Sequence, residues 1–246
     1  MDFYKILTPF YDEMIDFENR IIREKPFFKE LITSYKIKSA LDIGCGTGMH
    51  SIMFSELGVE SWGFDNSLEM IKKAKINAKK RNVNAVFKRL SLENWHSNIK
   101  RNFNAIFCLG NTLPHILHKN KLKKTIKNIY NGLSTEGIFM VQILNYYPIM
   151  KYQKRIVNIK KLGNHTFIRF YDFLNNIINF NILVLTEKDK KLDYKLITTE
   201  LMLIYKDELI EIIEEVGFKK VKCYGDFEKN RFYKNGSKDV IILAEK

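Results

Sequence analysis

The sequence predicts a doubly wound α/β fold, in which helices cover both faces of a mostly parallel sheet. Between Ala40 and Leu144, short runs of almost wholly apolar residues alternate with runs whose apolar residues recur at helical spacing. Strands that are apolar throughout are typical of parallel sheets buried on both faces. From Tyr152 to Tyr205 the pattern changes to alternating apolar and polar residues, which predicts an antiparallel sheet inserted into this core.

The core elements follow from their local patterns. Residues 39–43 form an apolar run ahead of three glycines, and Gly58 ends the helix that comes next. Asn66 or Ser67 is expected to cap the helix of 68–81, whose apolar residues share one face. The other core strands are expected at 60–65, 84–90, 103–109 and 137–144, and the core helices at 49–57, 68–81 and 121–133.

The insertion and the two ends of the chain complete this prediction. The alternating runs lie at 155–163, 165–176, 177–188 and 195–205, followed by a helix at 206–218 and strands at 219–225 and 238–246. The first 38 residues predict two helical pieces, broken near Pro9 and Pro26. We therefore expect one domain over 1–246, made of a helical lid (1–38), a ligand-binding core (39–145), an inserted antiparallel cap (146–205) and closing elements (206–246).

Composition excludes several classes of protein. With 46% hydrophobic residues over 246 positions, the chain can bury a sizeable core. Acidic residues lie among the apolar ones near the N-terminus, so we expect no signal peptide and no membrane span, and the cytoplasm is the default compartment. Cys45, Cys108 and Cys223 lie far apart, so neither a disulfide framework nor a metal site is expected.

The net charge of +13 raises the question of a nucleic-acid partner, because lysine and arginine neutralise phosphates. The basic residues recur in 71–81, 119–128 and 151–161, with apolar residues at helical or alternating spacing between them. This distribution favours solvated, lysine-rich faces. A basic docking surface for nucleic acid is the less favoured alternative.

The glycine-rich turn Gly44-Cys45-Gly46-Thr47-Gly48 predicts a ligand at the end of the first strand. A phosphate-binding P-loop is excluded, because no lysine followed by serine or threonine comes after the glycines. The dinucleotide fingerprint is also excluded, because its third glycine would come one residue later. Asp65 ends the second strand, where a carboxylate can take both ribose hydroxyls of a nucleoside.

The stretch "LDIGCGTG" and the acid in "GFDNS" resemble the first two motifs of class I S-adenosylmethionine-dependent methyltransferases. The resemblance implies a Rossmann-like fold, S-adenosyl-L-methionine as cofactor and S-adenosyl-L-homocysteine as product. It places Gly44 and Gly46 at the methionine portion of the cofactor, Asp65 at the ribose and Asn66 at the adenine edge.

Other cofactor contacts implied by the resemblance are less regular. Ser91 stands after the third strand where the family usually has an aspartate, and the backbone of Ser91 with apolar Leu92 is expected to hold the adenine. Leu109, at the end of the fourth strand, and Arg20, in the N-terminal segment, are further candidates for cofactor binding. Arg20 is also a weaker candidate for holding a carboxylate.

Several motifs are similar to the glycine and sarcosine N-methyltransferase group in particular. "LGNTLPH" (109–115) is similar to the G-N-S-x-x-H stretch of that group, and "FYKILTPFYDEMIDF" looks like its N-terminal segment, whose tyrosine folds over the cofactor. "NYYP" (145–148) resembles an Asn-Tyr pair that borders the acceptor site, and the C-terminal "YGDF" and "SKD" follow its pattern. The resemblance implies a small-molecule acceptor, with an amine nitrogen favoured.

Two residues are candidates for catalysis. His115 could accept a proton or hydrogen-bond the acceptor, and the alternative is a histidine that fixes the turn around Pro114. Tyr11 could cover the cofactor or direct its hydroxyl oxygen at the sulfonium, and the alternative is a core aromatic residue. The remaining histidines, at positions 50, 96, 118 and 165, show no ligand spacing and are expected to be structural.

Three residues are candidates for binding the acceptor. Asn145 and Tyr146 follow the fifth strand on the rim that carries the glycine turn. Arg169, in an alternating strand of the cap, could grip a substrate carboxylate through two hydrogen bonds, and the alternative is an exposed strand arginine.

The cofactor carries an activated methyl group, so the enzyme mainly has to hold a nucleophile in line with it. Placement alone can contribute roughly 7 kcal/mol. No strong base is required, but an amine must arrive neutral. The alternatives are an RNA or protein methyltransferase that uses the basic surface, and a non-catalytic cofactor-binding module. Monomer and homo-oligomer are equally open.

Overall fold

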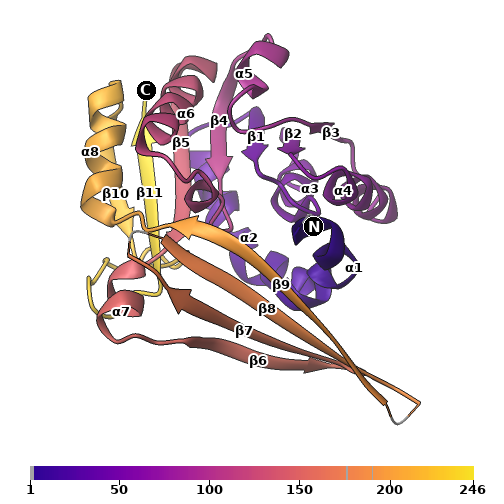
Figure 1. The fold of residues 1–246 in the computed structure, drawn as a ribbon. Coiled ribbons are helices and arrows are strands. Elements are labelled where there is room, and N and C mark those ends of the chain that lie inside the picture. Colours follow the sequence, from indigo (N-terminus) through magenta and orange to yellow (C-terminus); the bar gives the residue numbers. More distant parts are fainter. Residues whose placement is uncertain (1–2, 176, 190) are drawn as a thin grey trace.

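The computed structural model of the protein describes residues 3–175, 177–189 and 191–246. Its larger sheet, in the upper part of Figure 1, has seven strands. In spatial order they are β10 (Lys219–Tyr224), β11 (Asp239–Glu245), β5 (Leu133–Leu144), β4 (Phe103–Cys108), β1 (Ser39–Ile43), β2 (Glu60–Asp65) and β3 (Ala85–Arg89). Strands β1 to β5 run parallel, and β10 and β11 are antiparallel to their neighbours. The predicted doubly wound, mostly parallel sheet is confirmed.

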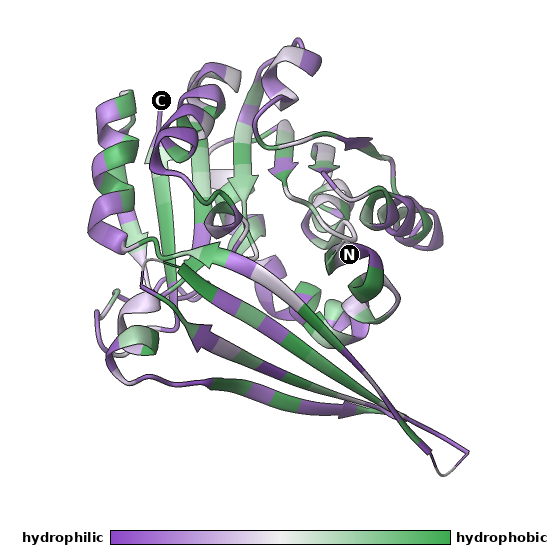
Figure 2. Ribbon diagram, in the orientation of Figure 1, coloured by the Kyte–Doolittle hydropathy of each residue, from purple (hydrophilic) through white to green (hydrophobic). Residues whose placement is uncertain are grey.

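Helices cover both faces of this sheet and bury two hydrophobic clusters against it. One face carries α2 (Phe17–Ser34), α3 (Met49–Glu56) and α4 (Leu68–Lys80), and the other carries α5 (Trp95–Asn98), α6 (Lys119–Gly132) and α8 (Lys206–Val216). Strands β4, β5 and β11 are mostly apolar and buried (Figure 2), as expected for strands covered on both faces, whereas the edge strands β3 and β10 carry exposed polar residues. Of the two proposed caps of α4, Ser67 is correct, since its hydroxyl accepts from the Met70 backbone N–H.

The four strands of the cap form a separate antiparallel sheet below the core in Figure 1. They are β6 (Ile156–Leu162), β7 (His165–Phe173), β8 (Ile177–Lys188) and β9 (Lys191–Met202), and α7 (Tyr146–Lys151) leads into them. The predicted insertion is therefore confirmed. The last strand begins four residues earlier than 195, because the exposed, polar residues at its start still pair with β8.

The N-terminal helix α1 (Phe3–Ile15) connects the core and the cap, because it packs against both α4 and β9. Its Leu7 and Met14 are buried together with Phe167, Ile182 and Ile197 of the cap. The inner face of the cap sheet is therefore held on the core through this helix.

The two proline breaks expected in the first 38 residues are wrong. Pro9 lies inside α1 and Pro26 lies inside α2, whereas the helices separate at Asp16, which adopts left-handed backbone angles (φ +60°). Both prolines are exposed. Proline has no N–H, so the carbonyl one turn before it loses its helical hydrogen-bond donor. Because both prolines are exposed, water can bond to that carbonyl instead, which lowers the free-energy cost of a proline inside the helix.

Three short helical elements were not expected from the sequence: α5, α7 and the 3₁₀ turn η1 (Leu113–His115). Each has six residues or fewer, too few for a hydrophobic period to show. None of the helices in the described ranges is both long enough and apolar enough to cross a membrane.

Candidate active site

A cavity of about 560 Å³ lies where β1, β2 and β4 end, next to α1. Open α/β sheets bind their ligands at this carboxyl edge. Ten residues singled out from the sequence line the cavity: Tyr11, Arg20, Gly44, Gly46, Asp65, Asn66, Ser91, Leu92, Leu109 and His115. The structure therefore brings together the expected cofactor residues and both expected catalytic residues.

The glycine turn forms one wall of the cavity and tolerates no larger residue. Gly44 and Gly46 have φ angles of +69° and +54°. A Cβ atom on Gly44 would lie 2.4 Å from the Cγ2 atom of Thr112, and one on Gly46 would lie 3.5 Å from the ring of Tyr11. The backbone angles therefore favour glycine at both positions, and at Gly44 the packing of Thr112 excludes a side chain as well, whereas a Cβ atom on Gly46 would make only an ordinary van der Waals contact.

Asp65 connects the glycine turn to the neighbouring strand. Its Oδ2 accepts a hydrogen bond from the Gly46 N–H (3.0 Å), and its Oδ1 accepts from the Ser67 N–H (2.9 Å). Burial raises the pKa of Asp65, and these two backbone donors oppose the rise. The carboxylate is therefore fixed in the cavity wall rather than free to turn into solvent.

Three ionisable side chains form a connected set beside the cavity, in which buried Glu24 joins two residues that line it, Arg20 and His50. The Arg20 Nε donates to Glu24 (2.8 Å), and the other oxygen of Glu24 lies 2.8 Å from the Nε2 of His50. Burial alone would raise the pKa of Glu24, but the hydrogen bonds and charges of His50 and Arg20 outweigh it and lower this pKa to about 2. Glu24 is only 3% exposed. Its carboxylate thus fixes the position of the Arg20 side chain at the cavity.

Two members of this set were missed from the sequence. The i, i+4 spacing of Arg20 and Glu24 on one helix could have indicated their pairing. The sequence gives no sign of a ligand role for His50, yet this residue lines the cavity and bonds to Glu24 from another helix. A contact between separate helices has no local sequence signal.

His115 lies in η1, where its Nε2 atom is 2.8 Å from the hydroxyl of Tyr4 in α1. Both residues line the cavity. Burial lowers the pKa of His115 to about 4, so the imidazole is neutral at neutral pH. Sequence reading missed Tyr4, which lies 111 positions away from its partner.

Tyr11 occupies the seam between the core and the cap. Burial raises its pKa to about 12, and the charges that act on its hydroxyl come from Arg20 and Asp65 on the core side and from Arg169 on the cap side. The hydroxyl therefore stays protonated at neutral pH and can donate or accept a hydrogen bond.

Arg169 lies on the inner face of β7, close enough to Tyr11 for the two side chains to interact, and does not line the 560 Å³ cavity itself. Its Nε donates to the Asn158 side chain (2.6 Å). Burial lowers the pKa of Arg169, and the hydroxyls of Tyr171 and Tyr11 raise it by a smaller amount. Among the described residues, no carboxylate pairs with this half-buried guanidinium.

Asn145 and Tyr146 lie outside the cavity wall. The Asn145 side chain caps α7 and donates to the backbone of Lys234 and Ser237. The Tyr146 hydroxyl bonds to Asn111 and is almost fully buried. Their assignment to the acceptor site stays a prediction, and the contacts seen here hold the start of α7 to the segment before β11 and to the loop after β4.

The chain is similar to known methyltransferases over most of its length. A family model described as a methyltransferase domain matches residues 40–137. A glycine/sarcosine N-methyltransferase of Halorhodospira halochloris is 27% identical over 251 residues, which cover 96% of this chain and 85% of that relative. A second one, from Aphanothece halophytica, is 27% identical over 96% of this chain and 86% of its own.

Solved structures show the same fold. An S-adenosylmethionine-dependent methyltransferase from Clostridium acetobutylicum matches with a TM-score of 0.84 at 17% identity, over 99% of both chains. DesVI from Streptomyces venezuelae matches with a TM-score of 0.76 at 15% identity, over 95% of both chains.

The sheet order, the glycine turn at its carboxyl edge and these matches define a class I methyltransferase. The matched methyltransferase domain, the relatives and the shared fold support an enzyme of that class, and S-adenosylmethionine is the cofactor that the sequence motifs lead us to expect. The resemblance inferred from the sequence motifs is thereby confirmed.

The wall of the cavity fits this cofactor by its chemistry. Asp65 presents a carboxylate suited to hydroxyl donors, and Arg20 presents a cation suited to a carboxylate. The hydroxyl of Thr47, which lines the cavity, is buried without a partner among the described residues. Apolar Leu92 and Ile116 also line the cavity and offer surface for a purine ring.

Glu24→Gln keeps the shape of the side chain but removes its charge. We expect a loss of about 3 kcal/mol in the free energy of unfolding at neutral pH, because His50 and Arg20 lose a buried carboxylate partner. In the folded protein the pKa of Glu24 is about 2, below the usual value of about 4.3 for a glutamate. The stabilisation by the Glu24 carboxylate is therefore complete at any pH above about 4.3. It is lost as the pH falls toward about 2, and urea titrations across this range measure it.

The matched control for this experiment is Glu18→Gln. Glu18 lies on the same helix and pairs with Arg81, but its side chain is 70% exposed, so its loss should cost less than about 1 kcal/mol. Equal losses in the two variants, or an unchanged pH dependence in Glu24→Gln, would contradict the role assigned to Glu24.

Proposed function

We propose that this enzyme transfers the methyl group of S-adenosylmethionine to the amino nitrogen of a small amino acid. The observation that carries the proposal is Arg169, a half-buried cation with no acid partner among the described residues. A buried charge without a partner is costly, and a substrate carboxylate would compensate it. The relatives named as glycine/sarcosine N-methyltransferases support the same acceptor class.

Arg169 is proposed to orient the acceptor as well as to bind it. Asn158 holds the Nε atom, which leaves the two terminal nitrogens for a carboxylate. Tyr11 is near both this guanidinium and the glycine turn, since its ring packs at Gly46 and the charge of Arg169 acts on its hydroxyl. An amino acid held at Arg169 would therefore present its amine toward the core side of Tyr11, where the cavity lies.

The cofactor is proposed to lie along the carboxyl edge of the sheet. Asp65 takes the ribose hydroxyls, the glycine turn faces the methionine portion, and Arg20 takes the methionine carboxylate. The adenine is assigned to Asn66, Ser91 and Leu92, and Leu109, which follows β4, is a further cofactor contact; all four line the cavity. This arrangement agrees with the order of these residues along the edge, from β1 through β2 to β3.

When bound, S-adenosylmethionine supplies a methyl group that needs no further activation. The protein's own contribution is placement: α1 covers the cavity, Arg169 fixes the carboxylate, and Tyr11 separates the amine from solvent. With a pKa of about 4, His115 holds a proton too weakly to deprotonate an ammonium group. We therefore assign His115 a hydrogen bond to the amine, with its ring oriented by Tyr4.

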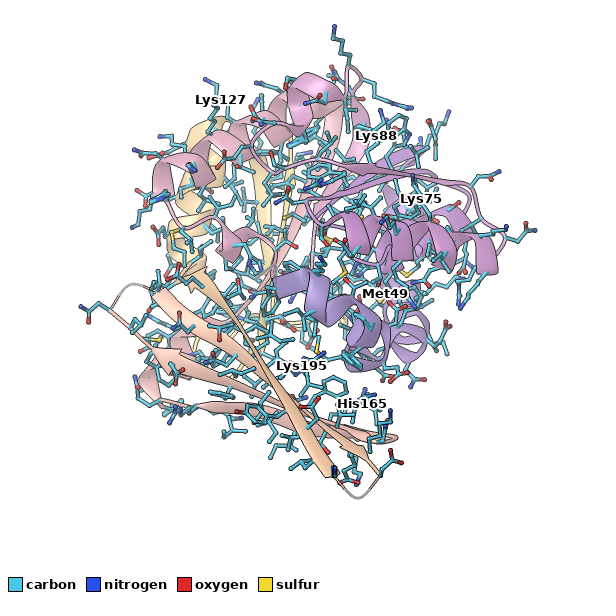
Figure 3. All side chains as sticks on the ribbon, turned by 45° about the vertical axis from the view of Figure 1, so that its right-hand side comes forward. Met49, Lys75, Lys88, Lys127, His165 and Lys195 are labelled. Carbon is cyan, nitrogen blue, oxygen red and sulfur yellow. The ribbon has the colours of Figure 1, made fainter. Side chains whose placement is uncertain are left out.

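The alternative of a macromolecular acceptor has less support. Figure 3 labels Lys75, Lys88, Lys127 and Lys195 on four elements spread around the molecule. A polyanion that reached the site would need basic side chains gathered at its rim. Among the described residues, three basic side chains line the cavity, Arg20, Arg89 and Lys121, and two of them are already paired, Arg20 with Glu24 and Lys121 with Glu93.

A screen with labelled S-adenosylmethionine tests the acceptor class. We expect turnover with glycine or sarcosine, little with methylamine, which lacks the carboxylate, and none with phenols or bulk RNA. The rate should change little between low and high salt, because no phosphate contacts are involved. Turnover on RNA alone with a steep salt dependence, or binding without any turnover, would overturn the proposal.

Asp65→Ala should weaken S-adenosylmethionine binding by about 100-fold, the loss expected for two hydrogen bonds to a charged acceptor. Calorimetry with the cofactor and with S-adenosylhomocysteine measures this. Asp193→Ala, an exposed acid on β9, is the matched control and should bind normally. Near-normal affinity in Asp65→Ala would remove the ribose contact from the proposal.

Arg169→Ala should raise the Michaelis constant for the acceptor by about 100-fold and leave that for the cofactor nearly unchanged, because only the acceptor carboxylate is released. Arg155→Ala on the same sheet is the control, since that side chain is 63% exposed and pairs with Asp172. If neither constant moves in Arg169→Ala, the carboxylate clamp is wrong.

A further inference from the structure

Gln142 is a buried polar side chain on β5, inside the larger sheet. It lies between Val141 and Ile143, which are fully buried, and is itself only 6% exposed. A buried amide costs free energy unless its oxygen and its nitrogen both have hydrogen-bond partners. The partners of Gln142 therefore indicate why an amide, rather than an apolar side chain, stands here.

The two ends of this amide bond to segments of the two neighbouring strands. The Oε1 atom accepts from the Gly110 N–H (2.7 Å), in the loop after β4, and the Nε2 atom donates to the Asp239 carboxylate (2.7 Å), at the start of β11. Strands β4 and β11 flank β5 (Figure 1), so the side chain connects all three. Because an N–H needs an acceptor and a carboxylate needs a donor, the two partners determine which end of the amide faces which.

The loop after β4 has an uncommon backbone. Gly110 and Asn111 both adopt left-handed angles, with φ of +69° and +64°. Such angles are unfavourable for most residues and persist where surrounding contacts hold them. Gln142 supplies two of these contacts, because its backbone carbonyl also accepts from the Asn111 N–H (3.2 Å). The Asn111 side chain adds a third, since it accepts from the Leu144 N–H (3.0 Å).

This loop lines the cavity and packs against the glycine turn. Gly110, Thr112 and His115 are all part of the cavity wall. A Cβ atom on Gly44 would lie 2.4 Å from Thr112, so the loop and the glycine turn are in close contact. The His115 N–H donates to the Thr112 carbonyl (3.2 Å), which holds η1. The place of the His115 side chain therefore depends on the backbone of this loop.

The backbone ladder of the sheet does not require the Gln142 side chain. Backbone pairing already joins β11 to β5 from Asp239 to Glu245, and joins β4 to β5 as far as Cys108. Gly110 lies beyond the end of that ladder, so the amide carries support from the sheet into the loop. Asp239 in turn occupies the Nε2 atom and keeps the Oε1 atom turned toward Gly110.

We propose that Gln142 and Asp239 are positioning residues for methyl transfer, which hold the loop after β4 so that His115 stays at a fixed place beside the cavity. Neither of the two lines the cavity, so both act through Gly110 and the residues that follow it. The proposal rests on the methyl transfer of the proposed function, and on the placement that such a reaction requires, but not on the identity of the acceptor.

Gln142→Glu tests this role, because it keeps the shape of the side chain but sets two carboxyl groups at hydrogen-bond distance. While the pair shares one proton, the new group can donate to Asp239 and accept from Gly110, as the amide does. Once both groups are ionised, the donor is lost and the two charges repel each other. The function of the variant should therefore be lost as the pH rises.

The surroundings of Asp239 set the direction of this pH dependence. Burial raises the pKa of Asp239, and the hydrogen bond from Gln142 opposes the rise. The variant removes this hydrogen bond and adds a like charge, so the pair loses its last proton at a higher pH than Asp239 would alone. The other charges that act on Asp239, those of Lys238, Arg20 and Glu24, are the same in the variant and in the unaltered protein.

We expect kcat of Gln142→Glu, divided by kcat of the unaltered protein at the same pH, to fall at least about 10-fold from about pH 6 to about pH 9. The affinity for S-adenosylhomocysteine should change by less than about threefold, because Asp65 and Arg20 keep their places. A residue that served stability alone would instead lower the two together. Gln153→Glu makes the same change at an exposed position and should show no such fall.

Gln142→Glu combined with Asp239→Asn exchanges the acid and the amide. The amide at position 239 can donate to the carboxylate at position 142, which still accepts from Gly110, and the net charge equals that of the unaltered protein. We expect kcat to return to within about threefold of the unaltered value at every pH, because the coupled pair is restored.

Nuclear magnetic resonance tests the loop without turnover, and so separates this proposal from the choice of acceptor. In the unaltered protein the Gly110 amide proton should exchange slowly with solvent, although it lies beside the cavity. His115 has a pKa of about 4, so its ring does not titrate between about pH 6 and about pH 9. Its ring signals should nevertheless move over this range in Gln142→Glu, and stay in place in the double variant.

Three results would each overturn the proposal: rapid exchange of the Gly110 amide proton, a kcat ratio of Gln142→Glu that does not change with pH, or a double variant no more active than the single one. If the unaltered protein methylates no amino acid, the exchange rate and the His115 signals still decide the proposal. Turnover of glycine without these signals would leave the proposed function standing and remove the positioning role.

Discussion

The hydrogen bond from the Gly46 N–H to the Asp65 carboxylate is the contact on which the site depends, since it joins two turns that lie 19 residues apart. It can form because β1 and β2 are parallel neighbours, with Ile43 paired to Phe64, so both strands end at one edge. The Cys45 N–H continues the same ladder to the Phe64 carbonyl. The sheet thus places the Asp65 carboxylate beside the glycine turn before any ligand is bound. Ordering these groups therefore adds little to the free-energy cost of binding.

Two charged side chains of this protein, Glu24 and Arg169, differ in whether the chain itself supplies their partners. Glu24 is buried, yet two partners on different helices satisfy both of its oxygens. Arg169 is half-buried and has one amide partner. Because burial without a counter-ion is unfavourable, the first arrangement is complete within the chain, whereas the second is completed only by a group from outside. This contrast, rather than the identity of either residue, supports an anionic acceptor.

Local sequence signals predicted most of the core and the cofactor wall. The "LDIGCGTG" turn, the acid of "GFDNS" and the strand patterns each lie within a few residues, where periodicity and glycine spacing are informative. The partners of His50 and His115 could not be predicted in this way, because Glu24 and Tyr4 come from other helices. The proline breaks failed for a related reason, since the cost of a helical proline depends on whether its side of the helix meets solvent. Asn145 follows the motif of the acceptor site, but its side chain is used to cap α7.

The antiparallel register of the cap decides which of its side chains face the core. Alternation sends Phe167, Arg169 and Tyr171 inward toward α1 and the core, and sends Ile168 and Phe170 outward. Helix α1 packs against this inner face and against the core, so it connects the strand that carries Arg169 to the sheet that carries the glycine turn. Because a loss of about 1 Å in placement is costly for a reaction that relies on position, this packing serves the fixed distance that the proposed acceptor site requires.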